Sequence, residues 1–196
     1  MIAIVDYRAG NLASVKKALD VLGAESAITS DPDVVRGAEK IILPGVGHFA
    51  ATRTLDELGL RDAASAAIRA GRPFLGICVG MQWMYEGSAE APEVAGLGLF
   101  AGRCERFPAA VKSPHVGWNQ VCANKPSRML RGVKPDAFVY YTHSYYGPLI
   151  DPCTGITEYG VEFAAVVEQE NVFGVQFHPE KSADAGLQVL RNFVEL

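Results

Sequence analysis

The sequence predicts a single-domain α/β fold with a mixed, mostly parallel sheet and helices on both faces. In the N-terminal half, apolar strand-like segments alternate with helical segments, and this alternation is typical of a doubly wound parallel sheet. In the C-terminal half, strand-like segments follow one another across tight turns, which indicates some antiparallel pairing. The chain contains no internal repeat, low-complexity stretch or linker, so we expect one domain over residues 1–196.

The N-terminal half is interpreted as four strands separated by helices. The strands are expected at residues 1–6, 24–29, 40–43 and 73–77. Leu12, Val15, Leu19 and Leu22 recur at steps of three and four, which predicts a helix that Asn11 could cap and that Gly23 could end. Further helical segments are expected at residues 30–33, where a short helix begins, and at residues 49–58, 60–70 and 81–86.

The C-terminal half is interpreted as mainly strands, closed by a helix. Residues 89–92 are predicted to form a loop, and residues 114–119 a short, turn-rich piece. The strands are expected at residues 97–107, 137–141, 160–169 and 171–177. Leu187, Leu190, Phe193 and Val194 follow helical spacing, which predicts a helix over residues 182–196.

Composition excludes several classes of protein. Hydrophobic residues make up 49% of the chain, which is ample for a core. The net charge of −4 comes from 18 basic and 22 acidic residues without a basic run, so we expect no nucleic-acid partner. No apolar stretch is long enough for a membrane span and no export signal is apparent, so we expect a cytoplasmic protein. The four cysteines are far apart, without Cys-x-x-Cys spacing, so we expect no metal, cofactor or disulfide framework.

Cys78 stands where a predicted strand would turn into a helix. Gly76 and Gly80 flank it at two residues on either side, which is the spacing of a nucleophile elbow. A helix that starts after Cys78 would stabilise a thiolate and direct free N–H groups at an incoming carbonyl oxygen. The alternative is a buried, inert thiol, because free cysteine is commonly buried.

A second chemical signal is His178-Pro179-Glu180 near the C-terminus. In an extended segment, His178 and Glu180 would point the same way, and a carboxylate beside an imidazole fixes its tautomer. His178 could then take the Cys78 proton and protonate a leaving amine, which contributes about 10²–10⁴ in rate. The alternative is an exposed strand end with ordinary polar residues.

A third signal is the glycine-rich turn Leu43-Pro44-Gly45-Val46-Gly47. Its N–H groups, together with that of Val79, could form an oxyanion hole. The alternative is a tight turn that only needs positive φ. Gln82, one helical turn after Cys78, is either a surface residue or a binder of a polar substrate.

In this order, the three signals resemble the triad-type, or class I, glutamine amidotransferases, whose glutaminase domain has a flavodoxin-like α/β fold. Within that superfamily the chain is most similar to the glutaminase subunits of imidazole glycerol phosphate synthase. Val79 stands where Leu is usual, and Val116 where Met is common. The similarity is carried from end to end of the chain, by residues 6–15, 43–47, 76–82, 115–119, 141–145 and 174–182.

The resemblance implies glutamine hydrolysis through a thioester. Cys78, His178 and Glu180 would be catalytic, and the backbones of Val46 and Val79 would hold the oxyanion. The resemblance also implies a set of glutamine-binding residues: Gly45, Gly47, Gln82, His143, Ser144 and Tyr145. We assign neither His115 nor the His143 side chain to catalysis.

The resemblance further implies a partner, a (βα)₈-barrel cyclase that forms a heterodimer with this chain and receives ammonia. Asn11, Trp118 and Lys181 match family positions at that interface or at the ammonia passage, although Trp118 could instead be a core aromatic. The cyclase yields imidazole glycerol phosphate and the purine intermediate AICAR.

Three rival interpretations stay open at this stage. The first is a glutaminase of the same class that feeds another pathway, for example a chorismate or pyridoxal-phosphate synthase. The second is a catalytically silent subunit that senses glutamine. The third is a cysteine peptidase built on a related elbow.

Overall fold

A nine-stranded sheet forms the centre of the molecule, and its parallel part comes mostly from the N-terminal half. The computed structural model describes residues 1–196. Five strands lie side by side and run parallel. In sheet order they are β2 (Ser26–Thr29), β1 (Ile2–Val5), β3 (Lys40–Gly45), β4 (Phe74–Cys78) and β13 (Val172–Val175).

Antiparallel strands extend this sheet beyond β13. They are β12 (Glu162–Gln169), β11 (Cys153–Glu158), β8 (His115–Ala123) and β9 (Ala137–His143). A separate four-stranded sheet contains, in order, β10 (Tyr145–Tyr146), β7 (Phe100–Arg106), β5 (Tyr85–Ser88) and β6 (Ala91–Ala95). The α/β architecture with a mixed sheet that the sequence predicts is therefore confirmed, although the large sheet has as many antiparallel ladders as parallel ones, four of each.

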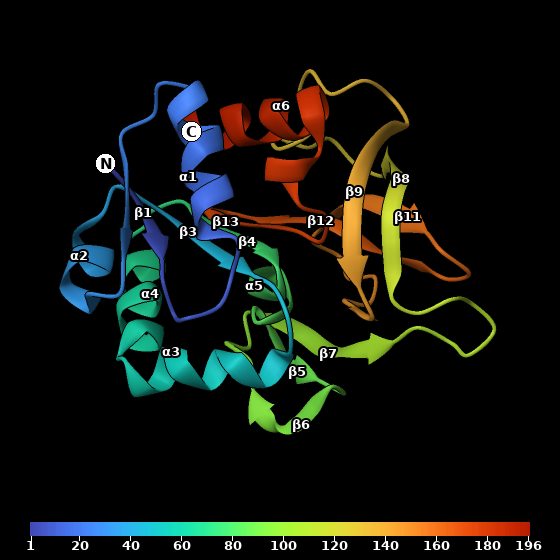
Figure 1. Cartoon of the computed structure of the whole chain (residues 1–196), viewed down its shortest axis with the longest axis horizontal. Coiled ribbons are helices and arrows are strands. Elements are labelled where there is room, and N and C mark those ends of the chain that lie inside the picture. Colours follow the sequence, from blue (N-terminus) through green and yellow to red (C-terminus); the bar gives the residue numbers. More distant parts are fainter.

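Helices cover both faces of the large sheet. Figure 1 shows α1 (Leu12–Val21) and α6 (Ala183–Val194) on one face, and α4 (Leu60–Arg69) on the other, beside α3 (Arg53–Glu57). The shorter elements are α2 (Pro32–Gly37), α5 (Val79–Gln82) and the 3₁₀ turns η1 (Phe49–Thr52) and η2 (Pro179–Lys181). None of the helices combines the length and apolar character needed to cross a membrane.

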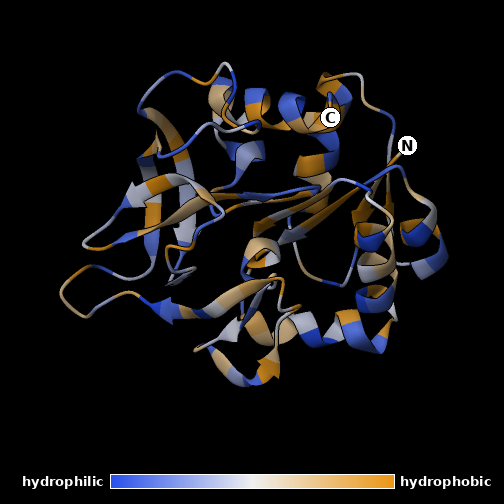
Figure 2. Ribbon diagram, turned by 180° about the vertical axis from the view of Figure 1, so that it is seen from behind, coloured by the Kyte–Doolittle hydropathy of each residue, from blue (hydrophilic) through white to orange (hydrophobic).

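The longer helices, α1, α4 and α6, pack on one hydrophobic core because each of them buries only one side. In α6, for example, Val189, Leu190 and Phe193 are buried while Arg191 faces water. Figure 2 shows this as hydrophilic and hydrophobic segments that alternate along the longer helices. Burial of one face of each helix is what holds it against the sheet.

Three expectations from the sequence are wrong. Residues 81–86 do not form a helix, because α5 ends at Gln82 and β5 begins at Tyr85. Residues 89–92 are not simply a loop, because β6 begins at Ala91. Residues 114–119 are not a turn-rich piece, because β8 runs from His115 to Ala123 and pairs with β9 along its length up to Val121.

Candidate active site

Cys78 ends β4 on a strained turn that leads directly into α5. Its backbone angles are φ 54° and ψ −110°, a region that non-glycine residues rarely adopt. A Cβ at Gly76 would lie 2.6 Å from the Gly80 carbonyl oxygen, and one at Gly80 would lie 1.9 Å from the Leu43 carbonyl oxygen. The two glycines therefore let strand and helix pass at a distance that any side chain would prevent, and the elbow predicted from the sequence is present.

His178 reaches the same edge of the sheet, because β13 lies next to β4 and runs parallel to it. The His178 Nδ1 atom lies 2.9 Å from Glu180 Oε1, and both side chains are only 1% exposed. The Nε2 atom of His178 is buried and makes no hydrogen bond. This leaves Nε2 free to exchange a proton at the Cys78 sulfur or at a substrate.

The charge state of His178 reflects both neighbours. Burial by itself lowers the pKa of His178, but the Cys78 sulfur and the Glu180 carboxylate together outweigh this effect and raise the pKa to about 10. His178 is therefore held as an imidazolium at neutral pH when the sulfur is a thiolate.

His178 and Glu180 are brought together by a turn and not, as the sequence predicts, by an extended segment. The extended backbone ends at His178, and Pro179–Lys181 forms a 3₁₀ turn, so side-chain alternation along a strand does not apply. The turn instead folds Glu180 back toward the imidazole. The predicted contact is present although the predicted reason for it is wrong.

Asn11 lies beside the triad rather than acting as a helix cap. It precedes α1, but its side chain makes no capping hydrogen bond. Its Nδ2 atom instead donates to Glu180 Oε1 at 3.3 Å. The oxygen that accepts from His178 is thus also held from the N-terminal half of the chain, a contact for which the sequence carries no signal.

The predicted oxyanion turn lies next to the elbow. Gly45 is paired with Cys78 across the ladder between β3 and β4, so the Val46 backbone leaves the sheet beside the nucleophile. The first N–H groups of a helix have no partner within the helix, and Val79 is the first residue of α5. The two predicted oxyanion donors therefore flank Cys78.

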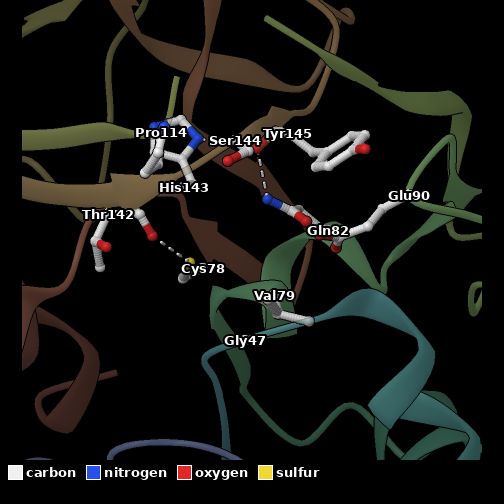
Figure 3. A pocket seen from close by; sticks show the side chains of 10 residues that line it. All are labelled: Gly47, Cys78, Val79, Gln82, Glu90, Pro114, Thr142, His143, Ser144 and Tyr145. Atoms are coloured by element: carbon white, nitrogen blue, oxygen red, sulfur yellow. Dashed lines mark hydrogen bonds between the residues drawn. The ribbon is translucent and has the colours of Figure 1, made fainter. Parts of the chain in front are cut away.

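A cavity of about 180 Å³ opens over the elbow. Figure 3 shows Cys78, Val79 and Gln82 on one side and Thr142, His143, Ser144 and Tyr145 on the opposite side. Of the predicted glutamine-binding residues, Gly45 alone does not line it. Three lining residues were not predicted from the sequence, namely Glu90, Pro114 and Thr142.

Gln82 is buried, so its interpretation as a surface residue is wrong. Its Nε2 atom donates to the Tyr145 carbonyl at 2.8 Å and to Gln176 Oε1 at 3.1 Å. Gln176 Nε2 in turn lies 3.6 Å from the Cys78 sulfur. Because both N–H groups of Gln82 are occupied, its amide oxygen is the atom left to accept a hydrogen bond from a ligand.

Trp118 is 52% exposed, so it is not a core aromatic. It packs edge-on against Tyr140, with 6.1 Å between the ring centroids. Lys181 lies on the same ring, with its Nζ atom 5.9 Å from the centroid. Val116 and Phe138 are also exposed. Together, Val116, Trp118, Phe138, Tyr140 and Lys181 form what we call the β8–β9 surface.

The comparisons with known proteins agree with this geometry. Residues 3–196 match the family described as glutamine amidotransferase class-I. The structure resembles a crystal structure of a glutamine amidotransferase (TM-score 0.78, 18% identity, 100% of both chains) and PurLQS from Thermotoga maritima (TM-score 0.77, 20% identity, 99% of this chain and 97% of the other). Fold and site thus define a class-I glutamine amidotransferase.

The sequence comparison narrows the class. The chain is 47% identical to imidazole glycerol phosphate synthase subunit HisH of Methanothermobacter thermautotrophicus, over 100% of this chain and 98% of that protein. It is 49% identical to the subunit HisH of Moorella thermoacetica, over 100% of this chain and 94% of that protein. The chain belongs to the HisH family of glutamine amidotransferase subunits.

Proposed function

We propose that this chain hydrolyses glutamine to glutamate and ammonia in the cytoplasm, and that it delivers the ammonia to a cyclase subunit of imidazole glycerol phosphate synthase. One observation carries the proposal: a cysteine on a nucleophile elbow and a paired His178–Glu180 meet at the edge of one sheet, beside a polar cavity. A peptidase would need an open groove for an extended chain, whereas this cavity suits a small polar molecule.

In the first half of the reaction, the Cys78 thiolate attacks the side-chain amide carbon of glutamine. The carbonyl oxygen becomes an oxyanion, which the N–H groups of Val46 and Val79 hold. His178 gives its proton to the amide nitrogen, the C–N bond breaks, and ammonia leaves a thioester on Cys78. Glu180 accepts from Nδ1 throughout and keeps the imidazole in the orientation that presents Nε2.

In the second half, His178 is neutral and acts as the base. It takes a proton from water, and the resulting hydroxide attacks the thioester carbon. The C–S bond then breaks, which releases glutamate and restores the thiolate beside the imidazolium. The sum is glutamine plus water giving glutamate, ammonia and one proton, which the new γ-carboxyl group loses to solvent.

The cavity supplies groups that match the two charged ends of glutamine. The free amide oxygen of Gln82 and the carboxylate of Glu90 are acceptors for the α-ammonium group. Gly47 and the backbone of residues 143–145 supply polar contacts for the α-carboxylate. Gly45 supports this site from beneath rather than by contact, because it does not line the cavity.

The partner follows from the chemistry of ammonia and from the relatives, which are named as subunits of a synthase. Ammonia released into neutral water becomes ammonium and loses its nucleophilicity, so the acceptor site must adjoin this one. We assign the acceptor to a (βα)₈-barrel cyclase that forms a heterodimer with this chain and yields imidazole glycerol phosphate and AICAR. The exposed Trp118 and Lys181 belong to the docking face, and Asn11 contacts Glu180 of the triad.

The test uses a glutamine-analogue electrophile and mass spectrometry. Wild-type chain with the cyclase should gain one adduct at Cys78, and Cys78→Ala should gain none. Cys122→Ala is the matched control, because Cys122 is the exposed thiol and its loss should leave labelling intact. If Cys78 in the wild-type complex gains no adduct, the chain is not a glutaminase. The partner is tested separately by a pull-down, and recovery of a synthase from another pathway would contradict the assigned cyclase.

A further inference from the structure

Two buried histidines face each other beside the glutamine pocket, His115 on β8 and His143 on β9. His115 Nδ1 lies 3.2 Å from His143 Nε2, and the two residues are paired across the ladder between β8 and β9. Their exposed fractions are 3% and 6%. Aromatic rings enclose the pair, contributed by Phe107, Tyr141, Tyr159 and Phe163.

Both rings are neutral. Burial lowers the pKa of His115 to about 4 and that of His143 to about 3. A neutral imidazole has one N–H donor and one acceptor nitrogen, so each ring must donate on one side and accept on the other.

The partner of His143 fixes the direction of these hydrogen bonds. His143 Nδ1 lies 2.9 Å from the Tyr145 carbonyl oxygen, which can only accept. The proton of His143 is therefore on Nδ1, and its Nε2 is the acceptor. It follows that His115 donates from Nδ1, and that its own Nε2 is an acceptor.

At the other end of this series of hydrogen bonds, the contacts of Asn119 support the same assignment independently. Asn119 Oδ1 accepts from the Gln120 N–H at 2.8 Å, and Asn119 Nδ2 donates to the Glu158 carbonyl at 2.9 Å. The orientation of the amide is thus fixed by two backbone partners. In this orientation Nδ2 also lies 3.4 Å from His115 Nε2, as a donor facing the atom that must accept.

The hydrogen bonds continue into the site. The Tyr145 carbonyl accepts from Gln82 as well as from His143, and Gln82 lines the cavity over Cys78. At the far end, His115 and Asn119 lie on the inner side of β8, whereas Val116 and Trp118 point outward from the same strand. The bonds therefore run in one direction from Asn119 to the Tyr145 carbonyl, and that shared carbonyl joins them to Gln82, the residue we assign to glutamine binding.

We propose that His115 and His143 are positioning residues that form a one-way hydrogen-bond relay, from Asn119 through both rings to the Tyr145 carbonyl. The relay fixes the position of that carbonyl and hence of Gln82, so that affinity for glutamine depends on the placement of β8. Neither ring touches the reacting atoms. This inference rests on the proposed function, since it concerns the same glutamine pocket.

Two substitutions at His115 separate the relay from simple packing. His115→Phe keeps a ring stacked on Tyr159, whose centroid lies 3.9 Å from that of His115, but removes the donor. His115→Asn removes the ring but keeps an N–H near the position of Nδ1. The relay predicts that His115→Phe raises the KM for glutamine about tenfold, the loss expected when a buried acceptor, here His143 Nε2, is left unpaired. It predicts that His115→Asn has a KM much closer to that of the wild-type chain. If His115 only fills space, His115→Asn should instead have the higher KM of the two variants.

The measurements are made on the complex with the cyclase. The KM and kcat for glutamine are measured for each variant. The rate at which iodoacetamide alkylates Cys78 is measured beside them, because it reports the reactivity of the thiol independently of glutamine binding, and it should be the same in all variants. NMR of the imidazole nitrogens should show a protonated Nδ1 and an unprotonated Nε2 on both rings in the wild-type chain. A protonated Nε2 on His143, or an Asn variant weaker than the Phe variant, would overturn the relay. Absence of glutaminase activity in the wild-type complex would instead reject the proposed function.

Discussion

Gly45 offers a sharp test of how the site is built, because it supports the oxyanion turn without lining the cavity. A Cβ at this position would lie 2.7 Å from each of three atoms: Gly80 N, Tyr7 Oη and Val79 Cβ. Two of these belong to the elbow and one to a buried ring, so none can move away freely. Gly45→Ala must therefore push β3 and the elbow apart.

The magnitude follows from this crowding. Inserting a methyl group into a packed interior costs about 1–3 kcal/mol of stability. If the strain is relieved by a shift of the turn, Val46 and Val79 no longer converge on the oxyanion. Loss of one such donor lowers kcat by about 10²–10³. We therefore expect a folded but less stable protein with a large loss of glutamine turnover and little change in ammonium-dependent synthesis by the complex.

Urea unfolding and steady-state glutaminase assays measure the two effects. Gly37→Ala is the matched control, because a Cβ there meets nothing within 4 Å and Ala favours the helix that Gly37 ends. Wild-type turnover and stability in Gly45→Ala would refute the close approach of β3 and the elbow.

Three further predictions concern the titrating and reacting groups. Cys78→Ala should abolish glutamine-dependent synthesis by the complex and leave synthesis from ammonium salts intact; loss of both would indicate a structural role for Cys78. Glu180→Gln removes a carboxylate that helps raise the pKa of His178 to about 10, so kcat should fall by about 10²–10⁴ and the alkaline limb of the pH–rate profile should move to lower pH; an unmoved limb would contradict the pairing. Because burial lowers the pKa of His143 to about 3 and of His115 to about 4, the unfolded chain binds more protons than the folded chain below the ordinary value of 6.5, so stability should fall as pH drops from there toward 4. The free energy of unfolding should fall by up to about 1.4 kcal/mol per pH unit for each ring. Urea unfolding of His115→Phe at several pH values should show a pH dependence that is smaller by the contribution of one ring.

The parts of the site that the sequence predicts are those encoded by short spacings. Gly76, Cys78 and Gly80 define the elbow because the chemistry of a strained turn requires small flanking residues. His178 and Glu180 were also paired correctly, although the 3₁₀ turn that joins them was not foreseen. Local spacing was sufficient there because the two residues are too close in sequence to be separated by the fold.

The missed features depend on contacts between distant segments. Residues 81–86 contain four apolar residues with only Gln82 and Glu86 among them, which is too short a pattern to distinguish a helix from a strand by periodicity. The pairing of β5 with β7 decides the outcome. β8 was hidden by Pro114 before it and by Gly117 within it, where φ is 135°, although the ladder with β9 tolerates both. Contacts of Asn11 with Glu180, and of Glu90 with the cavity, span the sequence and leave no local trace.

The backbone angles of Cys78 have a consequence for any attempt to move this chemistry to another protein. They are imposed by β3, β13 and α5 on every side, before a ligand arrives, so the nucleophile is already aimed when glutamine enters. A peptide of residues 76–80 grafted onto a surface loop would relax to ordinary angles and carry an idle thiol. The portable unit is therefore the surrounding scaffold with its three neighbouring segments, rather than the five-residue motif by which the site is found.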